Sequence, residues 1–202
     1  MPEQSSMHAY LNWAKERIDE MDAALASLEA RESRVEADTK AKAAELLAEL
    51  KTLRDRFTAT AKKTAEAGEA AFRRAETEMA SQLAQFEALV KTYFETVGRK
   101  LEAQEATFQK MADAQIKAWH EAADKLHAEA AKTAMAKRAE VDGAIRQMKA
   151  DAERAEARLK KMQEAGRESW TALSGALAES RKAFDHANKQ AWEAFAHAAS
   201  AK

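Results

Sequence analysis

The feature that most constrains the fold of this chain is an apolar stripe that recurs every three or four residues from Tyr10 to Ala61. No proline or glycine interrupts that stretch, and the single proline of the chain is at position 2. Steps of three and four place side chains on one face of an α-helix. The sequence therefore predicts an all-α protein. The stripe consists of Tyr10, Ala14, Ile18, Met21, Leu25, Leu28, Val35, Ala43, Leu46, Leu50, Leu53, Phe57 and Ala61.

The chain also repeats itself with an offset of 98 residues. The letters Glu66-Ala67-Gly68 return as Glu164-Ala165-Gly166, and large apolar residues fall on large apolar residues both before and after these letters. Such a register is typical of a duplicated structural unit. We therefore expect two tandem repeats, residues 1–98 and 99–202. Matched pairs include Leu50 with Met148, Phe72 with Trp170, Phe86 with Phe184, and Phe94 with Trp192.

Gly68 and Gly166, each preceded by a lysine pair, are the predicted turns. Each repeat is then a long helix followed by a shorter one that folds back: about 5–66 and 69–97, then about 99–164 and 167–198. A 60-residue helix would be about 90 Å long and would need a partner to cover its stripe. The predicted fold is an elongated antiparallel helical bundle or coiled coil.

Two alternatives to these helix boundaries stay open. A helix continuing from about 69 to 164 is one, because Leu101 keeps phase with Val97 across Gly98. The other is a bend in each of the stretches Arg31–Lys42 and Glu129–Glu140, because both are poor in large apolar residues. If both bend, each repeat becomes three helices of about 30 residues.

The composition of the chain argues against several classes of partner, bound group and location. Charged residues make up 33% of the chain, yet the net charge is −1, so nucleic acid is not an expected partner. The chain has no cysteine, which excludes disulfides and thiolate metal sites. It shows no signal peptide and no apolar run long enough to span a bilayer. We expect a cytoplasmic protein.

One trio of residues has metal-ligand spacing. His120, Asp124 and His127 are four and three residues apart, so they project from one side of a helix. The first repeat has Asp22, Ala26 and Glu29 at the same places, and we interpret the trio as solvated polar residues. Motifs for a catalytic nucleophile or a phosphate-binding loop do not occur. The sequence therefore predicts neither an enzyme nor a bound cofactor.

The large aromatic residues have two interpretations. They would form the core where helices pack on one another, or they would anchor an amphipathic face on lipid or on a hydrophobic polymer surface. Packing is the interpretation that we favour, because the polar faces mix both signs of charge. The residues concerned are Phe72, Phe86, Phe94, Trp119, Trp170, Phe184, Trp192 and Phe195.

The pattern of Glu-Ala-Gly followed by an aromatic residue, and then by alanine and phenylalanine, closes each repeat. It comprises Glu164-Ala165-Gly166 with Trp170, Ala178 and Phe184, and Glu66-Ala67-Gly68 with Phe72, Ala80 and Phe86. In this respect the chain resembles a group of small uncharacterised bacterial coiled-coil proteins, some of them stress-associated. It is more faintly similar to phasins, which coat polyester granules, and to the helical repeats of apolipoproteins.

These observations lead to two functional expectations. The first is a non-enzymatic scaffold or spacer that associates with itself as a homodimer or a higher oligomer. The second is a peripheral protein that adsorbs to lipid or storage-granule surfaces, as the phasin resemblance implies.

Overall fold

The computed structural model describes residues 2–97, 101–132, 138–165 and 170–200, and this part of the chain is all-α. The helices are α1 (Pro2–Glu29), α2 (Lys40–Ala67), α3 (Glu69–Thr96), α4 (Leu101–Lys132), α5 (Arg138–Ala165) and α6 (Trp170–Ser200). One short 3-10 helix, η1 (Glu32–Arg34), follows α1. The prediction of an all-α helical bundle is confirmed for the described residues.

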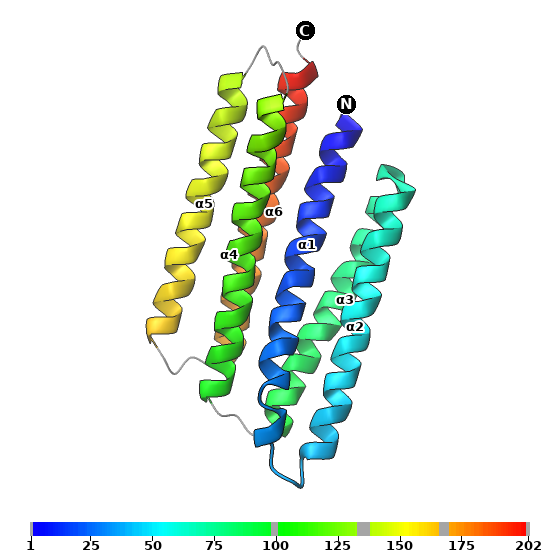
Figure 1. The fold of residues 1–202 in the computed structure, drawn as a ribbon, viewed down its shortest axis with the longest axis vertical. Coiled ribbons are helices and arrows are strands. Elements are labelled where there is room, and N and C mark those ends of the chain that lie inside the picture. Colours follow the sequence, from blue (N-terminus) through cyan, green and yellow to red (C-terminus); the bar gives the residue numbers. More distant parts are fainter. Residues whose placement is uncertain (1, 98–100, 133–137, 166–169, 201–202) are drawn as a thin grey trace.

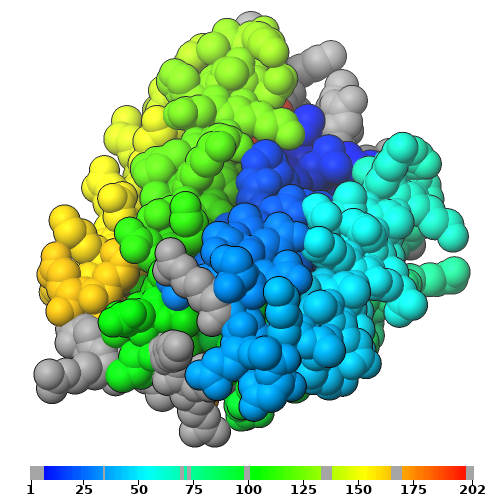
Figure 2. Space-filling view, turned by 60° about the horizontal axis from the view of Figure 1, so that its bottom comes forward, coloured from blue at the N-terminus to red at the C-terminus, as the bar shows by residue number. Residues whose placement is uncertain are grey.

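Helices α1 and α4 form an antiparallel pair at the centre of the bundle (Figure 1). The α2–α3 hairpin packs on α1, and the α5–α6 hairpin packs on α4. Helix α6 also lies along α1. In the space-filling view the surface of α1 lies between those of α4 and α2 (Figure 2). Helix α1 is thus covered from several sides within one chain.

The apolar stripes face one another and form two clusters. One cluster joins α1, α2 and α3 to Phe108 of α4 and Leu177 of α6. The second joins the rest of α4, α5 and α6 around Trp119 and Trp192. The matched stripe residues Leu50 and Met148 are both fully buried. The chain therefore covers its own apolar surface.

The prediction of a long helix over residues 5–66 is wrong, because α1 ends at Glu29 and α2 begins at Lys40. The chain turns in the stretch Arg31–Lys42, where Val35 has an extended backbone with ψ 136°. The long helix over 99–164 is likewise wrong: α4 and α5 are separate helices packed against each other. Folding back lets each helix cover the stripe of the next, which a single rod cannot do. Helices of 28 to 32 residues are about 42–48 Å long, so the 90 Å rod is also wrong.

The two halves of the chain have related helix boundaries but unequal packing. Helices α2 and α5 start 98 residues apart and end 98 residues apart. Helix α6 lies along α1, whereas α3, at the corresponding place in the first half, makes little contact with α4 within the described residues. The contact between α1 and α6 is therefore one that the first half does not repeat among the described residues.

Gly68 forms the turn between α2 and α3, as predicted. Its backbone has φ 83° and ψ −174°, and its N–H donates to the Thr64 carbonyl at 3.2 Å. This combination of angles is almost restricted to glycine. The predicted turn at Gly166 lies outside the described residues, as does Gly98.

We predict that Gly68→Ala lowers the free energy of unfolding by about 1–3 kcal/mol, because alanine is strained at this φ although the space around it is open. Urea denaturation followed by circular dichroism measures the change. Gly175→Ala, at an exposed site within α6, is the matched control and should stabilise by up to about 1 kcal/mol. If both substitutions changed the free energy of unfolding in the same direction, the assignment of the turn would be contradicted.

Candidate functional site

The most unusual part of the molecule is a layer of buried polar side chains between α1 and α6. Because other helices surround α1, part of its polar surface is buried as well as its apolar face. We call this layer the α1–α6 seam. It consists of the buried residues Asn12, Glu16, Arg17 and Glu20 from α1 with Arg181 and Asn188 from α6, and of Asp185 from α6, which is partly exposed.

The centre of the seam is the ion pair between Glu20 and Arg181. The guanidinium donates through Nε to Oε2 at 2.9 Å and through Nη2 to Oε1 at 2.8 Å, which is a bidentate arrangement. Glu20 is 1% exposed and Arg181 is 6% exposed. Arg181 Nη2 also lies 2.5 Å from Oε1 of Glu87 in α3. This arginine therefore ties together α6, α1 and α3.

A second ion pair lies one helical turn away along α1. Arg17 Nη2 lies 2.7 Å from Oδ2 of Asp185, and Arg17 also pairs with the neighbouring Glu16. The guanidinium carbon of Arg17 is 5.1 Å from the centre of the Trp13 ring, a cation–π distance. Glu16 Oε1 and Asp185 Oδ1 accept no hydrogen bond from the described residues. This end of the seam is less completely paired than its centre.

Neutral hydrogen bonds extend the contact between the two halves of the chain. Asn12 Nδ2 donates to Asn188 Oδ1 at 3.2 Å, and Asn188 Nδ2 donates to the Ala9 carbonyl at 2.7 Å. Between α1 and α4, the hydroxyls of Ser27 and Thr107 lie 2.9 Å apart. The halves thus meet through specific polar pairs in addition to apolar contact.

Burial and neighbouring charges shift the ionisation of the seam residues. Burial alone would lower the pKa of Arg181, but the carboxylates of Glu20 and Glu87 raise it above its ordinary value, so the arginine stays charged. Burial raises the pKa of Asp185 against the opposing charge of Arg17. Burial also raises the pKa of Glu16 to about 8; Arg17 opposes this shift, whereas Glu20 and Asp185 add to it.

The aromatic residues singled out in the sequence lie inside the bundle. Phe94 contacts Trp170 with ring centres 4.9 Å apart, and Trp119 meets Phe184 edge to face at 5.4 Å. These four side chains are buried, as are Phe86 and Trp192, while Phe195 is partly buried against Trp192. The side chain of Phe72 lies outside the described residues. In this closed form the aromatic residues pack the core.

The structure does not bring the candidate metal ligands together. His120 Nε2 faces Glu156 of α5 at 4.0 Å, Asp124 binds Lys149 at 3.1 Å, and His127 is exposed. Among the described residues, no group of three histidine or carboxylate side chains is arranged to hold a metal ion.

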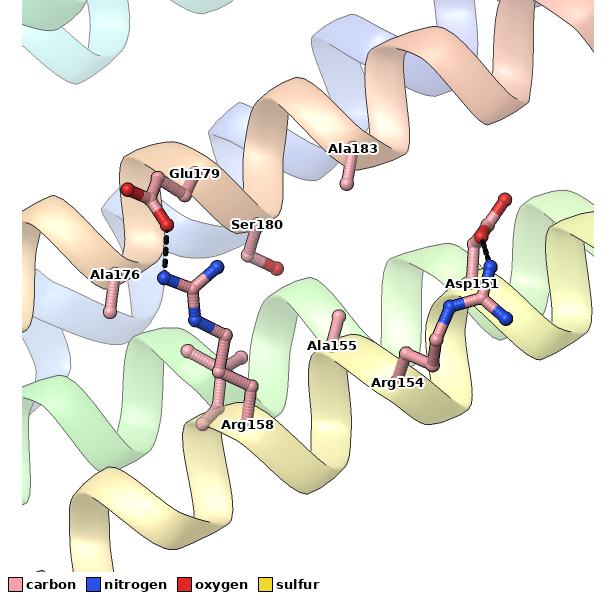
Figure 3. A pocket seen from close by; sticks show the side chains of 9 residues that line it. Asp151, Arg154, Ala155, Arg158, Ala176, Glu179, Ser180 and Ala183 are labelled. Atoms are coloured by element: carbon pink, nitrogen blue, oxygen red, sulfur yellow. Dashed lines mark hydrogen bonds and ion pairs between the residues drawn. The ribbon is translucent and has the colours of Figure 1, made fainter.

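Two grooves on the described part of the bundle are small. One lies between α5 and α6 and has a volume of about 160 Å³ (Figure 3). Alanines 155, 176 and 183 line it, and its two arginines are paired, Arg154 with Asp151 and Arg158 with Glu179. A second groove of about 240 Å³ lies beside Phe108 and Met162. Sites for drug-sized ligands are larger, about 300–1,000 Å³.

Sequence reasoning missed the seam, although the 98-residue offset carried a signal for it. Arg181 and Asn188 correspond to Leu83 and Val90 in the first repeat, so two polar residues stand at apolar positions. On the facing helix, Glu20 corresponds to Ala118. Polar residues that replace apolar ones in a single copy mark a contact that only this copy makes.

The fold and the seam together define a helical bundle whose two halves are joined by a buried ionic contact. Comparison with protein-family models, with curated proteins and with solved structures gave no significant match.

We predict that Arg181→Met lowers the free energy of unfolding by about 3–5 kcal/mol, because it leaves the Glu20 charge buried without a partner. The double variant Glu20→Met with Arg181→Met should recover most of that loss, since two apolar side chains of similar volume can replace a buried pair. Urea denaturation of the two single variants and the double variant forms a double-mutant cycle. Additive losses would show that the pair is not coupled.

We also predict that the bundle loses stability as the pH rises from about 4.5 to about 8, in proportion to the ionisation of Glu16. The folded state holds the Glu16 proton more tightly than the unfolded state, so this contribution is complete at acid pH and disappears through that window. Glu16→Gln cannot ionise. Its free energy of unfolding should exceed that of the parent by about 1 kcal/mol or more at pH 8.5. A difference that does not change with pH would contradict the prediction.

Proposed function

We propose that this protein is a non-enzymatic structural and interaction protein that associates with copies of itself, and that it is built from two tandem helical repeats. The equal offset of α2 and α5 supports the duplication. So does the burial of the matched aromatic residues Phe86 and Phe184, and of Phe94 and Trp192. A cytoplasmic location fits the sequence and is part of the proposal.

The observation that carries the proposal is the polar character of the surface where the two halves meet. Charged pairs and amide hydrogen bonds, set among apolar contacts, are the usual composition of an interface between molecules. Buried polar pairs contribute little net stability, and their best-attested role is to determine which helices pair and in what register. The α1–α6 seam therefore has the properties of a recognition surface.

The surface grooves support a non-enzymatic role. The groove between α5 and α6 places both arginines in ion pairs, and Ser180 is its buried hydroxyl (Figure 3). Among the described residues the Ser180 hydroxyl has no hydrogen-bond partner, whereas covalent catalysis requires a nucleophile within hydrogen-bond reach of a base.

Light scattering coupled to size-exclusion chromatography tests the proposal. The chain has a mass of 22.3 kDa, and we expect a species of twice that mass or more whose fraction rises with protein concentration. Small-angle X-ray scattering on the same fractions would give the shape of the assembly. A single-chain mass at every concentration up to the millimolar range would refute self-association.

A second candidate function is adsorption to lipid or to a polymer granule. It is supported by the amphipathic character of the helices and by the aromatic residues of their apolar faces, which an opened bundle would present to such a surface. None of the six described helices has the length and apolar character needed to cross a bilayer. The protein would therefore adsorb to the surface without crossing it. The two halves of the bundle would separate, and their apolar faces would contact the surface.

Flotation with neutral-lipid vesicles and with polyester granules tests this second function. We expect cosedimentation that Trp170→Ala and Trp192→Ala weaken. Leu50→Ala, which also removes a fully buried side chain, is the control for loss of stability. Equal binding by the tryptophan variants and the control would argue against aromatic anchoring.

A further inference from the structure

The contacts that join the two halves of the chain do not depend on the halves belonging to one molecule. We propose that two copies of this chain exchange halves, so that α1 of each copy pairs with α4 and α6 of the other. The partner is thus a second copy of the chain, and the contact surface is the α1–α6 seam with the adjoining face of α4. This inference rests on the proposed self-association and states how the two copies associate.

The contacts themselves support exchange. The Glu20–Arg181 pair and the Asn12–Asn188 hydrogen bond join α1 to α6 across 161 and 176 residues of sequence. The Ser27–Thr107 contact joins α1 to α4. In each case one partner lies before Thr96, where α3 ends, and the other lies after Leu101, where α4 begins. The same contacts form in full when the two partners come from different copies.

Leu101 provides an independent argument. It is 42% exposed and is the large apolar side chain that the described part of the chain leaves exposed. It stands seven residues from both Phe94 and Phe108, which are 2% and 1% exposed. On α4, Leu101 lies on the same face as Phe108. In the closed chain this apolar side chain is exposed, and the exchanged half of a second copy would cover it.

The seam also selects the correct partner helix. The corresponding contact between α3 and α4 would bring Leu83 and Glu87 against Ala118 and Gln115, where Arg181 and Asp185 meet Glu20 and Arg17 in the seam. Helix α6 of one copy therefore pairs with α1 of the other by charge, and the described residues of α3 form no equivalent charge pair with α4. Two such contacts related by a two-fold axis close the assembly as a dimer.

Cysteine pairs give a direct test, because the chain has none of its own. Ser27→Cys and Thr107→Cys replace two hydroxyls that lie 2.9 Å apart, and both sites are buried, so their thiols meet only when α1 packs on α4. The two single variants are mixed, unfolded and refolded together, treated with a short thiol-to-thiol crosslinker, and separated under denaturing conditions. We expect a covalent heterodimer at twice the mass of the chain.

The matched control uses a contact that exchange leaves within one copy. Thr60 of α2 and Gln82 of α3 lie 3.4 Å apart, so Thr60→Cys mixed with Gln82→Cys should give no crosslinked dimer. One outcome is a doubled mass by light scattering, with a crosslink that forms only within single chains of the double variant Ser27→Cys, Thr107→Cys. That outcome would overturn exchange and leave self-association standing. A single-chain mass throughout would overturn both.

Charge reversal provides a second measurement on the seam. Glu20→Arg and Arg181→Glu each place like charges face to face in their own closed chain. When the two variants are mixed, an exchanged dimer contains one reversed pair and one original pair, so both contacts are attractive. We expect the refolded mixture to have a higher Tm than either variant alone and a doubled mass. A mixture that melts as the sum of its components would overturn exchange.

Discussion

The fold depends on the requirement that each helix have its apolar stripe covered along its whole length. Most of the stability of a helix in a protein comes from the packing of its apolar face, and less comes from its own hydrogen bonds. The chain meets the requirement by placing α1 among the other helices, with α4 beside it and a hairpin on either side. The same position that secures the apolar face of α1 also buries its polar face. The ionic seam follows from that position.

The sequence predicted the parts of the fold that local chemistry determines. The spacing of apolar residues gave the helical class, and Gly68 gave a turn because glycine alone is comfortable with its backbone angles. The turn after Glu29 was harder to assign, because no glycine or proline marks it and only a scarcity of large apolar residues hints at it. The stretch Arg31–Lys42 mixes good and poor helix formers, so propensity alone does not say where the helix ends.

The seam could not be predicted from periodicity alone. Glu16 and Glu20 have the same spacing as Glu45 and Glu49, yet the first two are buried and the second two are exposed. The difference arises from the number of helices that surround α1 compared with α2, which is a property of the assembled bundle. The metal hypothesis for His120, Asp124 and His127 had the same weakness: spacing on one helix does not say what the neighbouring helices bring opposite it.

The separation of the seam residues along the chain has a consequence for protein synthesis. Helices α1, α2 and α3 leave the ribosome well before Arg181, which pairs with a glutamate 161 residues earlier. Until then the side of α1 that will meet α6 faces the surrounding solution. That side carries Glu16, Arg17 and Glu20, so the growing chain exposes charged side chains there. An apolar surface at the same place would promote aggregation. The charged residues of the seam therefore protect the unfinished polypeptide from aggregation before α6 is made and packs on α1.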